Sequence, residues 1–167
     1  RDSILAASGQ LSLDPVPGSL IAAAGDGPVG GQRFQALKEE QISAATGRYR
    51  SVYLPIARSV QPEALAIFDF TDPNIVLGSR DTTIVAPQAL YLMKSGFVEE
   101  QAKAMAVRIM KERGFEKRFA MACSLTCCRV PYPDELTAAK KLRGDSVADW
   151  TSICRALLSS ADFLFVN

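Results

Sequence analysis

The strongest constraint on the fold is a succession of short helix patterns between residues 87 and 158, each with its own start and stop signal. Pro87 and Pro133 each suit the first turn of a helix, because that position needs no backbone amide donor. Gly114 and Gly144 follow apolar-periodic segments and are typical helix ends, and Ser146 is a typical N-cap. Short helices joined by short turns favour antiparallel packing.

The most regular of these patterns runs from Phe97 to Arg113. Val98, Ala102, Met105, Ala106 and Ile109 form one apolar stripe at helical spacing. The same kind of reading predicts further helices over residues 87–95, 115–128, 133–142 and 147–158.

The first half of the chain is less regular. Residues 1–8 read as a short helix ended by Gly9, and Pro62 suits the start of another helix that runs to Phe68. Residues 10–31 are dense in Gly and Pro and predict a long irregular connection. Residues 50–56 alternate apolar and other side chains, which favours a short extended segment. We therefore predict a mainly α fold: an irregular helical domain with short antiparallel helix pairs, a long Gly/Pro-rich loop, and little or no β structure.

Size and charge limit the class of protein. A chain of 167 residues fits one domain over residues 1–167. Because the chain opens inside a helix pattern, we expect it to be the C-terminal fragment of a larger multidomain protein. A net charge of +1 gives no field that would attract nucleic acid, and no apolar run reaches the roughly 18 residues of a membrane span, so neither partner is predicted. Histidine is absent, which removes the commonest general base and metal ligand.

Arginines beside prolines, aromatics and acids are the main candidate binding residues. The predicted binding set is Arg48, Arg50, Arg58, Arg80, Asp81 and Arg129. Guanidinium groups hold carboxylates in fixed geometry, so the simpler interpretation is that they tie irregular loops together through Asp69, Asp72, Asp81, Asp134 or Glu135. The functional interpretation is a pocket for an anionic ligand, such as a sulfated or uronic sugar.

Four cysteines leave several interpretations open. The first interpretation is that all four are buried thiols: Cys123, Cys127, Cys128 and Cys154. The second is one disulfide from Cys154 to the other helix, and the third is a four-thiolate metal site. Because the paired C-x-x-C spacing is missing, no metal site is predicted. No catalytic residue is predicted either. A hydrolase would need paired carboxylates, which Asp69, Asp72 and Asp81 would supply around one loop.

Five ordered blocks resemble a known family. They cover residues 1–13, 48–73, 78–102, 128–136 and 149–167, including RYRSVYLPIARSV, GSRDTTIVAPQALYLMKSGF and CRVPYPDEL. The chain resembles the planctomycete cytochrome c-associated domain of unknown function, the PSD type, in its C-terminal part. Where the family tends to have an aliphatic residue or Gly before the R-x-P step, this chain has cysteines.

The resemblance implies a function class but no reaction. It implies a periplasmic or cell-surface location, and haem c on an associated domain rather than a cofactor in this chain. We predict a non-catalytic interaction or scaffold module of a multidomain cytochrome-associated bacterial protein. Its partners would be the rest of the parent polypeptide or other subunits, with polysaccharide a further possibility. The alternative is part of a hydrolytic or redox enzyme acting on polysaccharide, with a site shared with a neighbouring domain.

Overall fold

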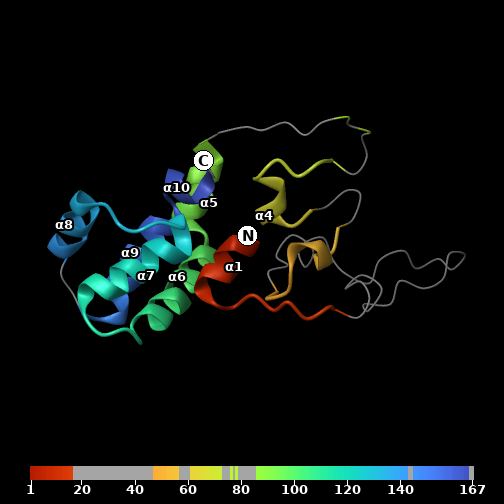
Figure 1. The fold of residues 1–167 in the computed structure, drawn as a ribbon. Helices are drawn as coiled ribbons and strands as arrows, with labels where there is room; N and C mark the ends of the chain where they lie inside the picture. The colour runs from red at the N-terminus through yellow and green to blue at the C-terminus, as the bar shows by residue number, and fades with distance from the viewer. Residues whose placement is uncertain are drawn as a thin grey trace, which may run out of the picture. The chain divides into compact units, whose positions relative to one another are not determined.

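The structure is a computed structural model that describes residues 1–16, 47–56, 61–72, 76, 78, 86–142 and 145–165. Within these residues the fold is mainly helical and contains no strand, as predicted; an isolated bridge joins Ser12 and Tyr49. The helices, drawn in Figure 1, are α1 (Asp2–Ser8), the 3-10 helix η1 (Ser51–Tyr53), α4 (Glu63–Ala66), α5 (Ala86–Lys94), α6 (Gly96–Ile109), α7 (Phe115–Cys127), α8 (Pro133–Lys141), α9 (Val147–Leu158) and α10 (Ala161–Leu164). None of them is long and apolar enough to cross a membrane.

The chain forms two compact units. The first contains Arg1 and residues 12–88, and the second contains residues 2–11 and 89–167. The prediction of a single domain is not tested by this division and stays a prediction. Residues 17–31 of the Gly/Pro-rich connection lie outside the described residues.

The core of the second unit lies where α6 packs against α9, with α1 and α7 completing it. The predicted stripe of α6 is fully buried, from Val98 to Ile109. Trp150 and Ile153 face it from α9, and the Trp150 ring lies 5.0 Å from the ring of Phe115 between centroids. Because both helices keep one apolar face, their packing removes that surface from water, which is the main source of stability here.

Polar contacts fix the helix ends in this unit. The Ser146 hydroxyl accepts from the Asp149 amide, which confirms the predicted N-cap of α9. The Arg108 guanidinium donates to the carbonyls of Ala6 and Ala7, at 3.0 and 2.9 Å, and so satisfies the last carbonyls of α1. Gly9 follows with a φ of +75°, the left-handed value that ends a helix.

Boundaries of two helices differ from the prediction. The α5 helix covers Ala86–Lys94, and α6 begins at Gly96 rather than Phe97, with Ser95 between the two helices. The α6 helix ends at Ile109 rather than Arg113, five residues before the stop signal at Gly114. Residues 111–114 are exposed, so no burial holds a further helical turn in place.

The prediction of an extended segment at residues 50–56 was wrong. Ser51–Tyr53 forms a 3-10 turn, in which the amides of Tyr53 and Leu54 donate to the carbonyls of Arg50 and Ser51 at 3.0 Å. Among the described residues, this segment has no neighbouring strand to pair with, and only an isolated bridge between Ser12 and Tyr49 forms nearby. Its backbone amides and carbonyls therefore form local hydrogen bonds instead. The guanidinium of Arg1 donates to the carbonyls of Gly47 and Tyr49 in the same unit.

Candidate functional site at the end of helix α7

The six predicted binding residues do not form one described cluster. Arg58, Arg80 and Asp81 lie outside the described residues. Arg48 and Arg50 belong to the first unit, where both are exposed and where their carbonyls accept from the amides of Ser12 and Tyr53. Arg129 belongs to the second unit, directly after α7. Anion binding by these residues therefore stays a prediction, and the site is built on Arg129.

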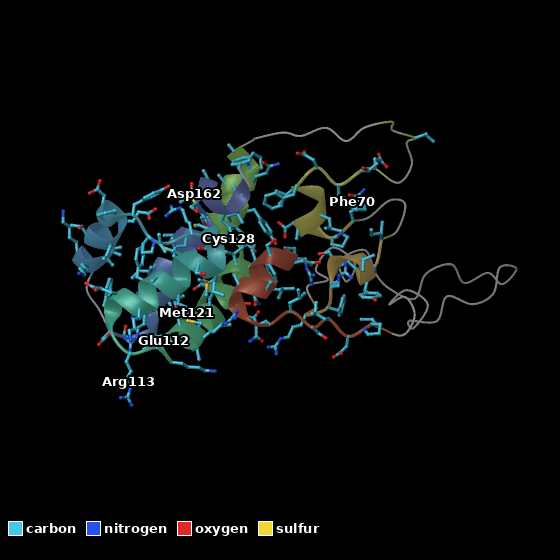
Figure 2. The ribbon with its side chains drawn as sticks, viewed as in Figure 1. Phe70, Glu112, Arg113, Met121, Cys128 and Asp162 are labelled. Carbon is cyan, nitrogen blue, oxygen red and sulfur yellow. The ribbon has the colours of Figure 1, made fainter. Side chains whose placement is uncertain are left out.

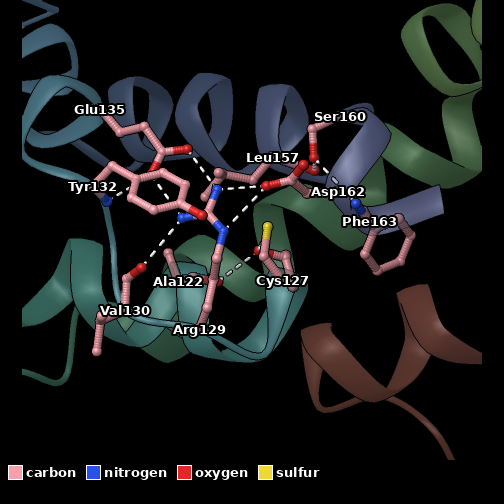
Figure 3. Close-up of polar contacts among 11 residues, drawn as sticks. Ala122, Cys127, Arg129, Val130, Tyr132, Glu135, Leu157, Ser160, Asp162 and Phe163 are labelled. Atoms are coloured by element: carbon pink, nitrogen blue, oxygen red, sulfur yellow. Dashed lines mark hydrogen bonds and ion pairs between the residues drawn. The ribbon is translucent and has the colours of Figure 1, made fainter. Parts of the chain in front are cut away.

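Arg129 is held by two carboxylates from different helices. Its Nη1 and Nη2 donate to Glu135 at 2.8 and 2.7 Å in a bidentate pair, and its Nε and Nη2 donate to Asp162 at 3.1 and 2.5 Å. The Tyr132 ring lies over the guanidinium, 4.1 Å from its carbon to the ring centroid. Figure 3 shows the guanidinium between the two acids, with α8 on one side and α10 on the other.

The electrostatics of this cluster follow from those hydrogen bonds. Donation to Glu135, and then to Asp162, raises the pKa of Arg129 further above its already high value. Donation from Arg129 lowers the pKa of Glu135, although partial burial opposes the shift. Glu135 also accepts from the Tyr132 amide at 2.8 Å at the start of α8. The cluster therefore keeps its charges and fastens α8 and α10 to the end of α7.

A groove of about 760 Å³ opens beside this cluster. Its lining comes from α1, the end of α7 and α10, all in the second unit. The lining is mixed, with more apolar than polar residues near α1 and α10: Ser3, Ala6, Ala7, Ser124, Leu125, Thr126, Cys127, Cys128, Arg129, Tyr132, Asp162, Phe163 and Phe165. Figure 2 labels Cys128 and Asp162, two of these lining residues.

The four cysteines divide into two kinds. All four are free thiols, so the predicted disulfide from Cys154 does not form. Cys123 and Cys154 are buried, and burial raises their pKa to about 11 and about 12, which makes them inert packing groups. Cys127 is half-buried and Cys128 is exposed, and both line the groove. In the described part of the chain, no group of three or more His, Cys, Asp or Glu side chains is arranged to hold a metal ion.

Sequence reasoning found part of the cluster. The proposed tie between an arginine and Glu135 is confirmed for Arg129. Asp162 was missed, since it lies 33 residues from Arg129 and carries no local signal that would connect them. Of the carboxylates considered for hydrolysis, Asp81 lies outside the described residues, and Asp69 adopts a left-handed turn with a φ of 56° and accepts from Gln88.

Comparison with known proteins gives a family match. A family model described as PSD1, protein of unknown function (DUF1553), matches residues 1–143. No curated protein and no solved structure matches the chain. The family match confirms the resemblance drawn from the sequence, and its description assigns no activity.

Proposed function

The chain belongs to the PSD1 (DUF1553) family of unknown function, and from that premise we propose that it is a non-catalytic interaction module. Its groove at the end of α7 would receive an apolar segment of a protein neighbour, either another domain of its polypeptide or a partner subunit. The parent protein would be an extracytoplasmic, cytochrome-associated bacterial protein, with haem c on a different domain. The single observation that carries the proposal is that the Arg129 donors are all engaged by groups of the same chain, while apolar side chains such as Phe163 and Phe165 line the groove beside it.

The state of Arg129 favours a protein neighbour over an anionic sugar. An anion-binding arginine presents free donors to the ligand, whereas the donors of Arg129 already meet two carboxylates and the Val130 carbonyl. A sulfate or uronate in the groove would also meet the charges of Asp162 and Glu135. Two acids against one arginine give the cluster a formal charge of −1, which repels such ligands.

The rim of the groove supports the same proposal. Tyr132 and Phe165 line it and are 59% and 42% exposed, and Val130, between two lining residues, is 79% exposed. Aromatic side chains and arginine are enriched at protein interfaces, where they give a large contact area on a firm base. The ion cluster behind Tyr132 supplies that base, because it holds the loop between α7 and α8 in one conformation.

Site-specific photo-crosslinking tests this function. A benzophenone amino acid would replace Phe165 in the groove lining or Val130 next to it, or Val107 or Leu142 as matched exposed apolar positions elsewhere in the same unit. The protein would be produced in its bacterial host at native level, and crosslinked peptides would be read by mass spectrometry. We expect both groove positions to react with the same segment of the same neighbour, and that segment to be apolar.

A second substitution makes the result specific. Val130→Asp places a charge on the rim without touching the core, so it should abolish the adduct formed from position 165. Equal crosslinking from the groove and control positions, or an adduct at position 165 that survives Val130→Asp, would contradict the docking role.

A further inference from the structure

We propose that Cys127 and Cys128 form a dithiol site for a thiophilic metal ion of low coordination number, with Cu(I) as its representative. The observation behind it is that two adjacent free thiols line one open groove while the other two cysteines of the chain are buried. This inference does not depend on the proposed docking function, because it concerns a small ion at one end of the groove.

The end of α7 places both thiols on the groove. Cys127 is the last helical residue, and Cys128 then takes the left-handed conformation, with φ 53° and ψ 28°. Adjacent residues of a continuing helix are rotated by about 100° about its axis, so their side chains do not face each other. The left-handed turn redirects the second side chain, and both residues contribute to the groove wall. Figure 3 shows the Cys127 sulfur on the side of the helix end that faces Asp162.

The two thiols are poorly suited to joining each other. Adjacent Cα atoms across a trans peptide are about 3.8 Å apart, whereas disulfides usually span about 4.4–6.8 Å between Cα atoms. A disulfide between neighbours therefore strains the backbone and is easily reduced. The pair stays a dithiol, and a metal ion bridges the sulfurs without that constraint.

The number and kind of donors select the metal. Thiolates prefer soft ions such as Cu(I), whereas a structural zinc site needs four ligands. In the described residues no third His, Cys, Asp or Glu completes a larger set, so an ion satisfied by two sulfurs fits best. Binding forms two metal–sulfur bonds and releases two thiol protons to solvent, with no change of oxidation state. The Thr126 hydroxyl donates its proton to the Ala122 carbonyl at 2.8 Å, and its oxygen lies 3.4 Å from the Cys127 sulfur, where it accepts from the thiol until the metal replaces that proton.

Anaerobic titration with Cu(I), in competition with a chromophoric Cu(I) chelator, tests the site on the reduced full chain. We expect one ion per chain, coordinated by two sulfurs in X-ray absorption spectra. Cys127→Ser and Cys128→Ser should each lower the affinity at least about tenfold and remove the two-sulfur signature. Cys154→Ala, which removes a buried thiol elsewhere, should leave both readouts unchanged, and circular dichroism would verify that every variant is folded.

Three results would overturn the assignment. They are Cu(I) affinity that is unchanged in Cys128→Ser, an equal loss in Cys154→Ala, or a metal-linked dimer in size-exclusion chromatography. The last would mean that the sulfurs come from two chains. Crosslinking from positions 130 and 165 is read without metal, so failure of the metal site and failure of the docking function are separate outcomes.

Discussion

The interface between α6 and α9 and the end of α7 are built by opposite means. The first buries Val98, Met105, Ile109, Trp150 and Ile153 almost completely, with apolar contacts and no charge. The second joins α7, α8 and α10 through charges around Arg129 and leaves apolar side chains exposed at its rim.

This difference suggests that the α6–α9 interface serves stability and the end of α7 serves binding. Burial of large apolar side chains contributes several kcal/mol for each residue, whereas partly exposed ion pairs contribute about 1 kcal/mol or less. Most of the stability of the second unit therefore comes from the α6–α9 interface. The end of α7 can carry exposed thiols and aromatics because little stability depends on it.

The largest effect should come from the core. Trp150→Ala should lower the free energy of unfolding by about 3–5 kcal/mol, because it removes a fully buried side chain that packs on Phe115. Trp150→Phe should cost less, since in the described residues the indole nitrogen is buried without a hydrogen-bond partner. Val107→Ala, on the exposed face of α6, is the control with almost no effect. Urea unfolding followed by circular dichroism would measure all three. If Trp150→Ala lowers the free energy of unfolding no more than Val107→Ala does, the α6–α9 interface is not the main source of stability.

A smaller effect should come from the polar contact that joins α1 to α6. The Ser8 hydroxyl lies 2.8 Å from the Gln101 side-chain oxygen, and both residues are buried. Ser8→Ala leaves that oxygen unsatisfied and should cost about 1–3 kcal/mol. Adding Gln101→Leu removes the orphaned group, so the double variant should recover part of the loss. If the double variant is less stable than Ser8→Ala, the hydrogen bond is not the reason for the cost.

The ion cluster should give an effect of about 1 kcal/mol, and only above acidic pH. The pKa of Glu135 is lowered in the folded protein, so its contribution is complete above the unfolded carboxyl pKa of about 4.3. It is lost as the pH falls below that value through the folded pKa. Glu135→Gln should therefore destabilise the protein at pH 7, and the difference from the parent should shrink as the pH falls through the folded pKa, as read by thermal melts across pH. A difference of equal size at pH 3 would show that charge is not its source.

The helices that sequence reasoning predicted best are those whose signals are local. Pro133 begins α8 and Ser146 caps α9, as predicted, because a cap or a proline acts on its own turn. The apolar stripe of α6 is buried as predicted, because its period alone identifies the face. The segment at residues 50–56 was mispredicted, since alternation indicates a strand only when a neighbouring strand exists to pair with.

The candidate site was harder to predict because its parts are distant in the sequence. The pair of Arg129 and Glu135 spans six residues and was anticipated, whereas Asp162 comes from α10 and required the packed fold. The role of Cys128 also depends on the fold. A cysteine pair in the sequence does not reveal that α7 ends between the two residues, or that the second adopts a left-handed conformation.

Cys128→Gly tests most directly whether the end of α7 serves binding rather than stability. A non-glycine residue at φ 53° carries backbone strain that glycine relieves, so the variant should gain about 0.5 kcal/mol of stability. The same variant removes one of the two proposed sulfur ligands. Melting and Cu(I) titration on one sample should therefore show an unchanged or higher melting temperature together with loss of the high-affinity site. A lower melting temperature, or Cu(I) binding equal to that of the parent protein, would contradict the account.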